Sequence, residues 1–181
     1  MNPQGGPYDG QSDPPPLPAP CHVPLPGAPI LVSACLVGIP CRYDGASQAI
    51  PGYLAHTIAG ELIPVCPEML GGLSAPRCPA QIEAGGGYQV IAGCSRVIDE
   101  CGDDVTDAFL DGAYATLSIA REAGAVQAIF KERSPSCACC RLHRGGTLVS
   151  GAGVTTALLR MHGIRVLSEV QGFAGLRERV A

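Results

Sequence analysis

The sequence has no tryptophan, few other aromatic residues and no long apolar run. Aromatic residues make up 4% of the 181 residues, so we expect a core of aliphatic side chains, for which an apolar content of 46% is sufficient. A membrane-spanning helix needs about 18 or more consecutive apolar residues, and the sequence contains no such run. The formal net charge of −4, from 12 basic and 16 acidic residues, gives no indication of a surface that binds polymeric nucleic acid.

The first 20 residues lack the features of a secretory signal. They contain no Lys or Arg and no apolar segment, so we expect a cytoplasmic protein. Ten of the 181 residues are cysteines, about 5.5%, which is below the roughly 8–10% typical of a disulfide scaffold. Cysteines in a reducing cytosol are core residues, catalytic thiols or metal ligands, and their positions have to decide between these roles.

Proline is concentrated at the N-terminal end. Residues 1–29 contain ten of the 17 prolines. Proline fixes φ and has no backbone N–H, which prevents a helix or a central strand from forming. We therefore predict a disordered, Pro/Gly-rich tail over residues 1–29 and a single domain over residues 30–181.

Short apolar runs alternate with helical patterns in the rest of the chain. Runs bounded by Gly or Pro are typical of strands buried on both faces, and they cover residues 30–34, 62–65, 125–130 and 164–167. Helices are expected at 154–161, at 50–59, and from Asp103 or Asp104, as a cap, to Gly124. Residues 83–102 are Gly-rich and are expected to form a loop. The alternation predicts an α/β fold, a Rossmann-like three-layer domain with a mostly parallel sheet.

Three cysteines follow predicted strands. Cys35 and Cys66 come directly after the first two strands, and Cys137 lies in the loop after the third. Ligands of parallel sheets bind at the carboxyl ends of the strands, so these thiols are expected to meet at one edge. Thiolates favour Zn, Cu(I) or Fe–S, and an iron–sulfur cluster, zinc, thiol chemistry or plain core packing all remain open at this point.

The sequence around these cysteines resembles the thiouracil desulfidase (TudS) family, also known as domain of unknown function 523. The resemblance covers residues 30–170 and is carried by three longer motifs and several shorter ones. The longer motifs are SACLVGIPCRYDG at 33–45, PVCPE at 64–68 with GGL at 71–73 and PR at 76–77, and KERSPSC at 131–137; the shorter ones lie at 102–106, 151–155 and 168–169.

The resemblance implies an enzyme with a [4Fe–4S] cluster held by Cys35, Cys66 and Cys137. The fourth iron is expected to bind the sulfur of a small thiolated pyrimidine, thiouracil or 4-thiouridine monophosphate. The implied products are the oxo base and hydrogen sulfide, with no net redox change. Coordination would polarise the C=S bond as a Lewis acid does, so that water can add to the carbon.

Several polar residues beside these cysteines are candidates for catalysis or substrate binding. Glu68 is the best-placed carboxylate for proton transfer, and Ser134 and Ser136 are candidates to orient water or the base. The alternative interpretations are that Glu68 is an ordinary loop charge and that the two serines only shape the turn. Arg42 pairing with Asp44 in a turn is likewise the alternative to a role in binding. The candidates for binding the substrate are Arg42, Asp44, Arg77, Lys131 and Arg133.

Other cysteines compete for the ligand role. Cys139 and Cys140 follow Ala138, where the family usually has glycine after the third cysteine, and Cys41 lies six residues after Cys35. Any of the three could close the site as a fourth ligand. The alternative function is therefore a non-catalytic Fe–S or Zn protein, metal-binding or regulatory, that uses the cluster of cysteines from Cys137 to Cys140. We expect Cys94 and Cys101 to be free or redox-sensitive thiols and assign no role to Cys78.

Overall fold

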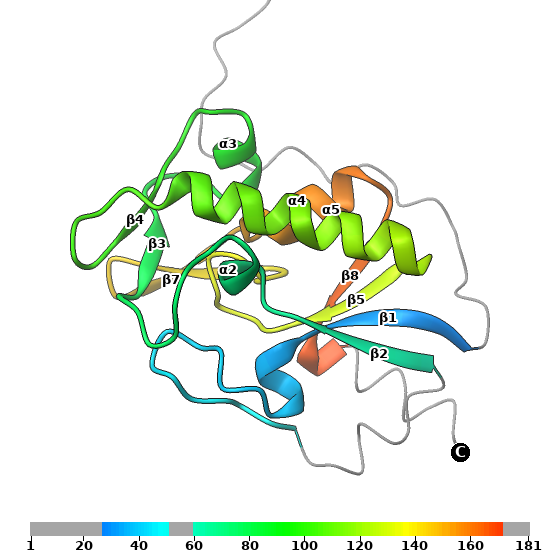
Figure 1. Cartoon of the computed structure of the whole chain (residues 1–181). Coiled ribbons are helices and arrows are strands. Elements are labelled where there is room, and N and C mark those ends of the chain that lie inside the picture. The colour runs from blue at the N-terminus through cyan, green and yellow to red at the C-terminus, as the bar shows by residue number, and fades with distance from the viewer. Residues whose placement is uncertain (1–26, 51–59, 172–181) are drawn as a thin grey trace, which may run out of the picture.

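The computed structural model describes residues 27–50 and 60–171 (Figure 1). Its centre is a four-stranded sheet in the order β2-β1-β5-β8, in which every pair of neighbours is parallel. The strands are β1 (Gly27–Ser33), β2 (Gly60–Val65), β5 (Gln127–Phe130) and β8 (Arg165–Ser168). All four correspond to predicted apolar runs, so the predicted α/β architecture is confirmed. Pro64 of β2 pairs with Val32 of β1. Because β2 lies at the edge of the sheet, the missing backbone N–H of the proline is tolerated there.

Two helices cover one face of the sheet. They are α4 (Thr106–Ala123), which ends at Gly124 with a φ of 68°, and α5 (Val154–Met161). Figure 1 shows both on one side of the strands, with the 3-10 helix η1 (Ala34–Val37) and the helical turn after β8 on the other. Asp104 accepts hydrogen bonds from the backbone N–H and the hydroxyl of Thr106, so it supports the start of α4, although Val105 is the N-cap.

The core lies on both faces of the sheet. Alternation along β1 sends Leu31 toward α4 and α5, and Ile30 and Val32 toward η1. The predicted apolar stripe of α4 is buried from Phe109 to Ala120. The core is mainly aliphatic, as expected, but its two largest fully buried side chains are Phe109 and Phe130.

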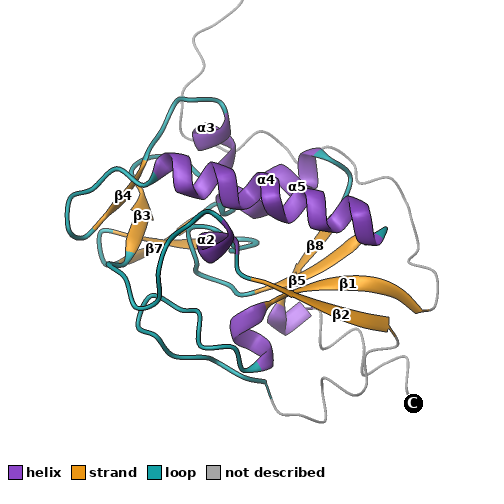
Figure 2. Cartoon of the chain, viewed as in Figure 1, coloured by secondary structure: helices purple, strands orange, loops and turns teal. Residues whose placement is uncertain are grey.

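Several small elements lie outside the central sheet (Figure 2). The segment 83–102 is not simply a loop, because α3 and β4 fall in it and β4 pairs antiparallel with β3. A second antiparallel hairpin, β6–β7, was not predicted. These elements are α2 (Pro67–Leu70), β3 (Ala80–Ile82), α3 (Gly87–Ile91), β4 (Val97–Asp99), β6 (Arg141–Arg144) and β7 (Thr147–Ser150).

The first strand of the sheet begins earlier than predicted. Residues 27–29, assigned to the tail from the sequence, belong to β1, so the predicted boundary was three residues late. The remainder of the predicted tail and nearly all of the predicted helix at 50–59 lie outside the described residues. No helix in the described ranges is long and apolar enough to cross a membrane.

Candidate functional site

The three cysteines that follow strands meet in one cavity at the carboxyl end of the sheet. Cys35 lies in η1 after β1, Cys66 directly follows β2, and Cys137 lies in the loop after β5. Since β2, β1 and β5 are neighbours in the sheet, their carboxyl ends lie together. All three cysteines line a cavity of about 560 Å³. The structure therefore brings these three residues to the edge that the sequence predicted.

The loop that carries Cys137 is held by hydroxyl groups. The Ser134 hydroxyl accepts hydrogen bonds from the backbone N–H groups of Ser136 and Cys137, each at 3.1 Å. The Thr156 hydroxyl donates to the carbonyl of Cys137 at 2.7 Å. At the start of α5, the N–H of Gly153 donates to the Ala138 carbonyl at 2.8 Å, so the backbone of the loop is fixed from both sides.

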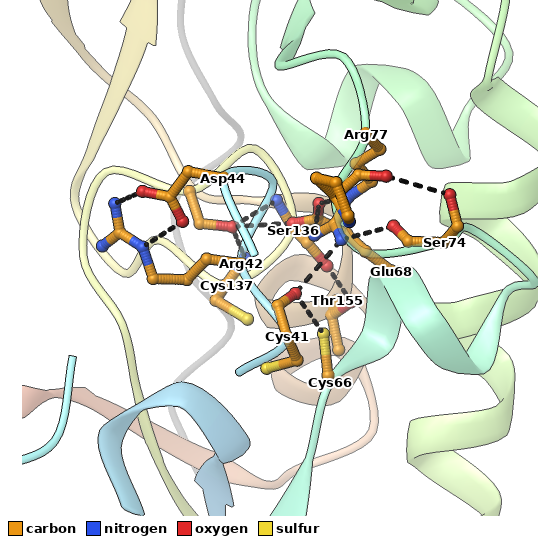
Figure 3. A network of polar contacts seen from close by, with 12 residues as sticks. Cys41, Arg42, Asp44, Cys66, Glu68, Ser74, Arg77, Ser136, Cys137 and Thr155 are labelled. Carbon is orange, nitrogen blue, oxygen red and sulfur yellow. Dashed lines mark hydrogen bonds and ion pairs between the residues drawn. The ribbon is translucent and has the colours of Figure 1, made fainter. Parts of the chain in front are cut away.

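A fourth cysteine shares the cavity. Cys41 lines it and is 2% exposed, and its carbonyl accepts hydrogen bonds from the Cys66 thiol and from Nη1 of Arg77. Figure 3 shows the side chains of Cys41, Cys66 and Cys137 gathered on one side of the polar network. Cys41 is therefore the one competing thiol that the fold places beside the predicted ligand set.

Burial favours the protonated form of three of the cavity thiols, those of Cys35, Cys41 and Cys137. Burial, followed by the neighbouring Cys66, raises the pKa of Cys35 to about 11 and that of Cys41 to about 12. Burial also raises the pKa of Cys137 well above its usual value, while a hydrogen bond with the Ser33 hydroxyl opposes the shift. A metal that binds thiolates at this site must therefore displace protons.

Glu68 lies at the start of α2, one residue after Pro67, and faces the same cavity. Nε of Arg77 donates to Oε2 of Glu68 at 2.9 Å, and Nη2 donates to the same oxygen. The Ser134 hydroxyl donates to Oε1 at 3.3 Å. Because Ser134 also holds the N–H of Cys137, one hydroxyl connects the carboxylate to the loop of the third cysteine.

Close packing of two helices positions Glu68. Gly71, which ends α2, and Gly112 in α4 face each other where the two backbones approach. A Cβ on Gly112 would collide with the carbonyl of Pro67, and a Cβ on Gly71 would collide with the carbonyl of Ala108. The glycines therefore allow the short helix that begins beside Cys66 to lie directly on α4.

Most of the predicted substrate-binding cations already bind protein groups. Arg42 lines the cavity, but its guanidinium binds both carboxylate oxygens of Asp44 and the side chain of Gln48. Asp44 does not line the cavity, which agrees with the turn-pairing alternative. Nζ of Lys131 contacts Glu169 at 2.7 Å. In the described parts of the chain, Arg133 lines the cavity without a hydrogen bond or ion pair from its guanidinium.

Three residues that were candidates for catalysis or metal binding do not line the cavity. Ser136 is fully buried, does not line the cavity and shares a 2.9 Å hydrogen bond with the hydroxyl of Thr155, an environment that indicates a structural role. Cys139 is buried and Cys140 is exposed, and neither lines the cavity. The structure therefore gives no support to a metal site built on the cysteines from Cys137 to Cys140.

The expectation of a free thiol at Cys101 is wrong, because Cys101 pairs with Cys78, a residue to which the sequence assigned no role. The two form a disulfide, whereas Cys94 is free and exposed. The bridge connects the segment after Arg77 to the turn after β4, where Glu100 also donates its N–H to the carbonyl of Pro79. The two cysteines are 23 residues apart, with β3, α3 and β4 between them, so no local pattern indicates that they pair.

The unpredicted hairpin forms part of the cavity wall. His143, Arg144 and Gly146 of β6–β7 line it, together with Gln81 of β3. The sequence did contain a signal, because two adjacent glycines separate two short runs. Gly145 and Gly146 have φ values of 54° and 75°, the left-handed values that a two-residue hairpin turn requires.

No three thiols of the cavity bring their sulfur atoms within 4.8 Å of one another in the described residues. Among the described residues, only Cys78, Asp99 and Cys101 bring three metal-binding atoms within 4.8 Å of one another, and two of these are joined as a disulfide. The cavity thiols are therefore spread more widely than around one tetrahedral zinc, where ligands lie about 3.8 Å apart because Zn–S bonds are about 2.3 Å. Wider spacing fits a cluster in which each thiolate binds a different metal atom.

Comparisons with known proteins agree with this geometry. A family model described as 2-thiouracil desulfurase matches residues 30–171. YbbK, an uncharacterised protein of Bacillus subtilis (strain 168), is 43% identical over 143 residues, which is 77% of this chain and 95% of YbbK. A solved structure of a [4Fe–4S]-dependent thiouracil desulfidase, TudS, is 40% identical, with a TM-score of 0.68 over 84% of this chain and 98% of that one.

Proposed function

This chain belongs to the 2-thiouracil desulfurase family, and from that premise we propose that it replaces the sulfur of a thiolated pyrimidine with oxygen from water. The C=S bond breaks, a C=O bond forms, and water supplies the oxygen of the base and both hydrogens of hydrogen sulfide. No electrons are gained or lost. The observation that carries the proposal is the single cavity lined by Cys35, Cys66, Cys137 and Glu68.

The proposed cofactor is a [4Fe–4S] cluster held by Cys35, Cys66 and Cys137. Soft thiolates in a buried cavity, spread more widely than single-ion ligands, support this choice, as does the 40% identity to a [4Fe–4S]-dependent desulfidase. When bound, the cluster supplies an iron without a protein ligand, a Lewis acid for the soft sulfur of a thiocarbonyl.

Glu68 is the proposed base for the attacking water. One of its oxygens is occupied by Arg77. Among the described residues, Oε1 receives only the 3.3 Å bond from Ser134 and keeps a lone pair for a water proton. Glu68 then returns this proton toward the departing sulfur. Ser134 and Arg77 position the carboxylate, and Arg77, whose nitrogens all bind protein acceptors, is assigned this role instead of contact with substrate.

The proposed substrate is a small thiopyrimidine. Thiouracil and 4-thiouridine monophosphate both carry the required thiocarbonyl, and the cavity volume of about 560 Å³ lies within the range of ordinary small-molecule sites. Polymeric nucleic acid is not expected, since the net charge of the chain is −4.

The test is an assay after anaerobic reconstitution with iron and sulfide. Sulfide and oxo base are measured with thiouracil for the wild type, Glu68→Gln and the exposed control Glu122→Gln. General-base catalysis contributes about 10²- to 10⁴-fold, so Glu68→Gln should lose that much in kcat while binding as much iron as the wild type. Equal rates for Glu68→Gln and the wild type would remove Glu68 from the mechanism. A wild type that binds iron but releases no sulfide would contradict the proposed reaction.

A further inference from the structure

A disulfide lies directly beside the arginine that holds Glu68. Cys78 is the residue after Arg77, and it is bonded to Cys101 in the turn after β4. Neither cysteine lines the cavity, and neither takes part in the proposed reaction. The disulfide can therefore influence the site only through the residues that it holds in place.

The turn that carries Cys101 is fixed by its own hydrogen bonds. Oδ1 of Asp99 accepts the backbone N–H groups of Cys101 at 3.0 Å and of Asp103 at 2.9 Å. The N–H of Asp99 donates to the carbonyl of Asp103, and the N–H of Gly102 donates to the carbonyl of Asp99, both at 3.0 Å. The turn therefore gives Cys78 a well-defined anchor.

The same turn leads directly into α4. The N–H of Val105 donates to the carbonyl of Val97 in β4 at 2.9 Å. The hydroxyl of Thr106, the first residue of α4, accepts the N–H of Val97 at the same distance. The disulfide therefore ties the segment that carries Arg77 to the N-terminal end of α4.

Both members of the pair formed by Glu68 and Arg77 are thus attached to one helix. Glu68 lies on α2, which packs closely on α4 through Gly71 and Gly112. Arg77 is attached to the start of α4 through the disulfide of the next residue. Because a common support keeps two groups at a fixed separation, the disulfide helps to keep the guanidinium on the carboxylate. Such positioning has a direct effect on the rate of a reaction that the carboxylate assists.

Without the disulfide, hydrogen bonds hold this segment. The N–H of Arg77 donates to the carbonyl of Tyr43, and the N–H of Glu100 donates to the carbonyl of Pro79, both at 2.8 Å. Hydrogen bonds of this kind open locally far more often than a covalent bond does. Loss of the disulfide should therefore increase the time that Arg77 spends away from Glu68.

The disulfide is accessible to thiols, because Cys101 is exposed and Cys78 is half-buried. Exposed disulfides exchange more readily than buried ones, and regulatory disulfides are of this kind. A glutathione thiolate attacks Sγ of Cys101, the S–S bond breaks, and Cys78 leaves as a thiolate that takes up a proton. A second glutathione then releases Cys101 as a thiol. Two electrons pass to the protein, and the two glutathiones become one glutathione disulfide.

We propose that Cys78 and Cys101 are positioning residues whose disulfide keeps Arg77 on Glu68, so that turnover depends on the redox state of this pair. The inference rests on the proposed function and adds regulation to it. The oxidised protein is the fully active form, and reduction of the disulfide lowers kcat. KM for the thiopyrimidine stays unchanged, because Arg77 acts through Glu68 and not on the substrate.

The experiment varies the redox state of the cluster-loaded wild type. The protein is equilibrated anaerobically in glutathione buffers of increasing reducing strength. Alkylation and mass spectrometry give the fraction of disulfide between Cys78 and Cys101, and bound iron, kcat and KM are measured on the same samples. As the disulfide is lost, kcat should fall by about 3- to 100-fold, since a displacement of about 1 Å can cost about 10²-fold in rate, while KM and iron stay constant. Reoxidation with glutathione disulfide should restore kcat.

Three variants separate the disulfide from other thiols. Cys78→Ser combined with Cys101→Ser should turn over at the rate of the reduced wild type and give no response to glutathione. Cys94→Ser, which changes an exposed free thiol, should respond as the wild type does. Arg77→Gln should lose no further activity on reduction, because the disulfide acts through Arg77. A wild-type kcat that is independent of the disulfide fraction, or that falls only as iron is lost, would overturn the proposal.

Hydrogen exchange tests the role of the disulfide without turnover. In the reduced wild type the backbone N–H groups of Arg77 and Glu100 should exchange faster, whereas that of Ala157, which donates to Gly153 in α5, should exchange at an unchanged rate. Unchanged exchange at Arg77 would overturn the proposal. Faster exchange at Arg77 in a protein that releases no sulfide in either redox state would support the positioning role and contradict the proposed function.

Discussion

Arg77 binds a single oxygen of Glu68 with two of its nitrogens, Nε at 2.9 Å and Nη2. The two side chains are 9% and 15% exposed, so the pair is largely removed from water. The third nitrogen of the Arg77 guanidinium, Nη1, donates hydrogen bonds to the carbonyls of Cys41 and Ser74. One arginine therefore orients the carboxylate and connects it to the segment that carries the fourth thiol of the cavity.

Replacing Arg77 should affect turnover and stability together. In Arg77→Gln the largely buried Glu68 carboxylate loses its charge partner, which should lower the free energy of unfolding by about 3 kcal/mol. Because Arg77 acts through Glu68, kcat should fall while KM for the thiopyrimidine stays close to that of the wild type. Urea unfolding and steady-state assays measure the two effects. In the background of Glu68→Gln, the Arg77 replacement should lower kcat little further, and additive losses would contradict the coupling.

Two neighbouring serines should behave differently. Ser134→Ala leaves two backbone N–H groups without an acceptor and removes the hydrogen bond to Glu68, so both kcat and stability should fall, the latter by about 1–3 kcal/mol. Ser136→Ala breaks the buried contact with Thr155 and should lower stability alone. Parallel thermal unfolding and sulfide assays compare them. A large loss of kcat in a folded Ser136→Ala protein would restore that residue to the catalytic set.

We expect the cysteines to divide into those that bind the cluster and those that do not. Cys35→Ala, Cys66→Ala and Cys137→Ala should each lose most bound iron after anaerobic reconstitution, because each removes one thiolate of the proposed set. Cys41→Ala should retain iron, as should the buried control Cys139→Ala, which does not line the cavity. Iron and acid-labile sulfide analysis measures this directly. Loss of iron from Cys41→Ala to the level of Cys35→Ala would make Cys41 a ligand.

A remote glycine should be needed for catalysis. In Gly112→Ala the new methyl group collides with the carbonyl of Pro67, so α2 must move away from α4, and Glu68 and Cys66 must move with it. We expect lower stability together with a loss of kcat and of bound iron. Ser118→Ala, an exposed change on the same helix, is the matched control. A Gly112→Ala protein with full iron content and full activity would show that this close packing does not position the site.

The parts of the fold that the sequence predicts are those with strong local patterns. The four parallel strands contain short, mainly apolar runs, and α4 has both an apolar stripe and a glycine at its end. Because the carboxyl ends of neighbouring parallel strands meet, the cysteines after β1, β2 and β5 could be placed together without coordinates. This topological rule explains why Cys35, Cys66 and Cys137 could be predicted to lie together in one cavity.

The remainder depends on contacts that leave no local pattern. The hairpin β6–β7 has only four-residue strands, and its anchors are long-range bonds, such as Arg144 to the carbonyl of Ile82 and Gly145 to Gln81. The sequence likewise cannot show which cavity cations are already paired. Arg42 and Arg133 look alike in the chain. Only the structure shows that Arg42 binds Asp44 and that the Arg133 guanidinium has no hydrogen bond or ion pair with any residue of ranges 27–50 and 60–171.

The most direct test of the central claim is to relate sulfide release to bound iron in a single anaerobic series. Preparations reconstituted to different extents, with zinc-loaded protein as a parallel sample, are assayed for sulfide and oxo base from the same thiopyrimidine. The account predicts equal amounts of the two products and a rate that rises in proportion to iron, up to about four atoms per chain, with none from zinc. Zinc-loaded protein with the full rate, or iron-loaded protein that releases no sulfide, would contradict it.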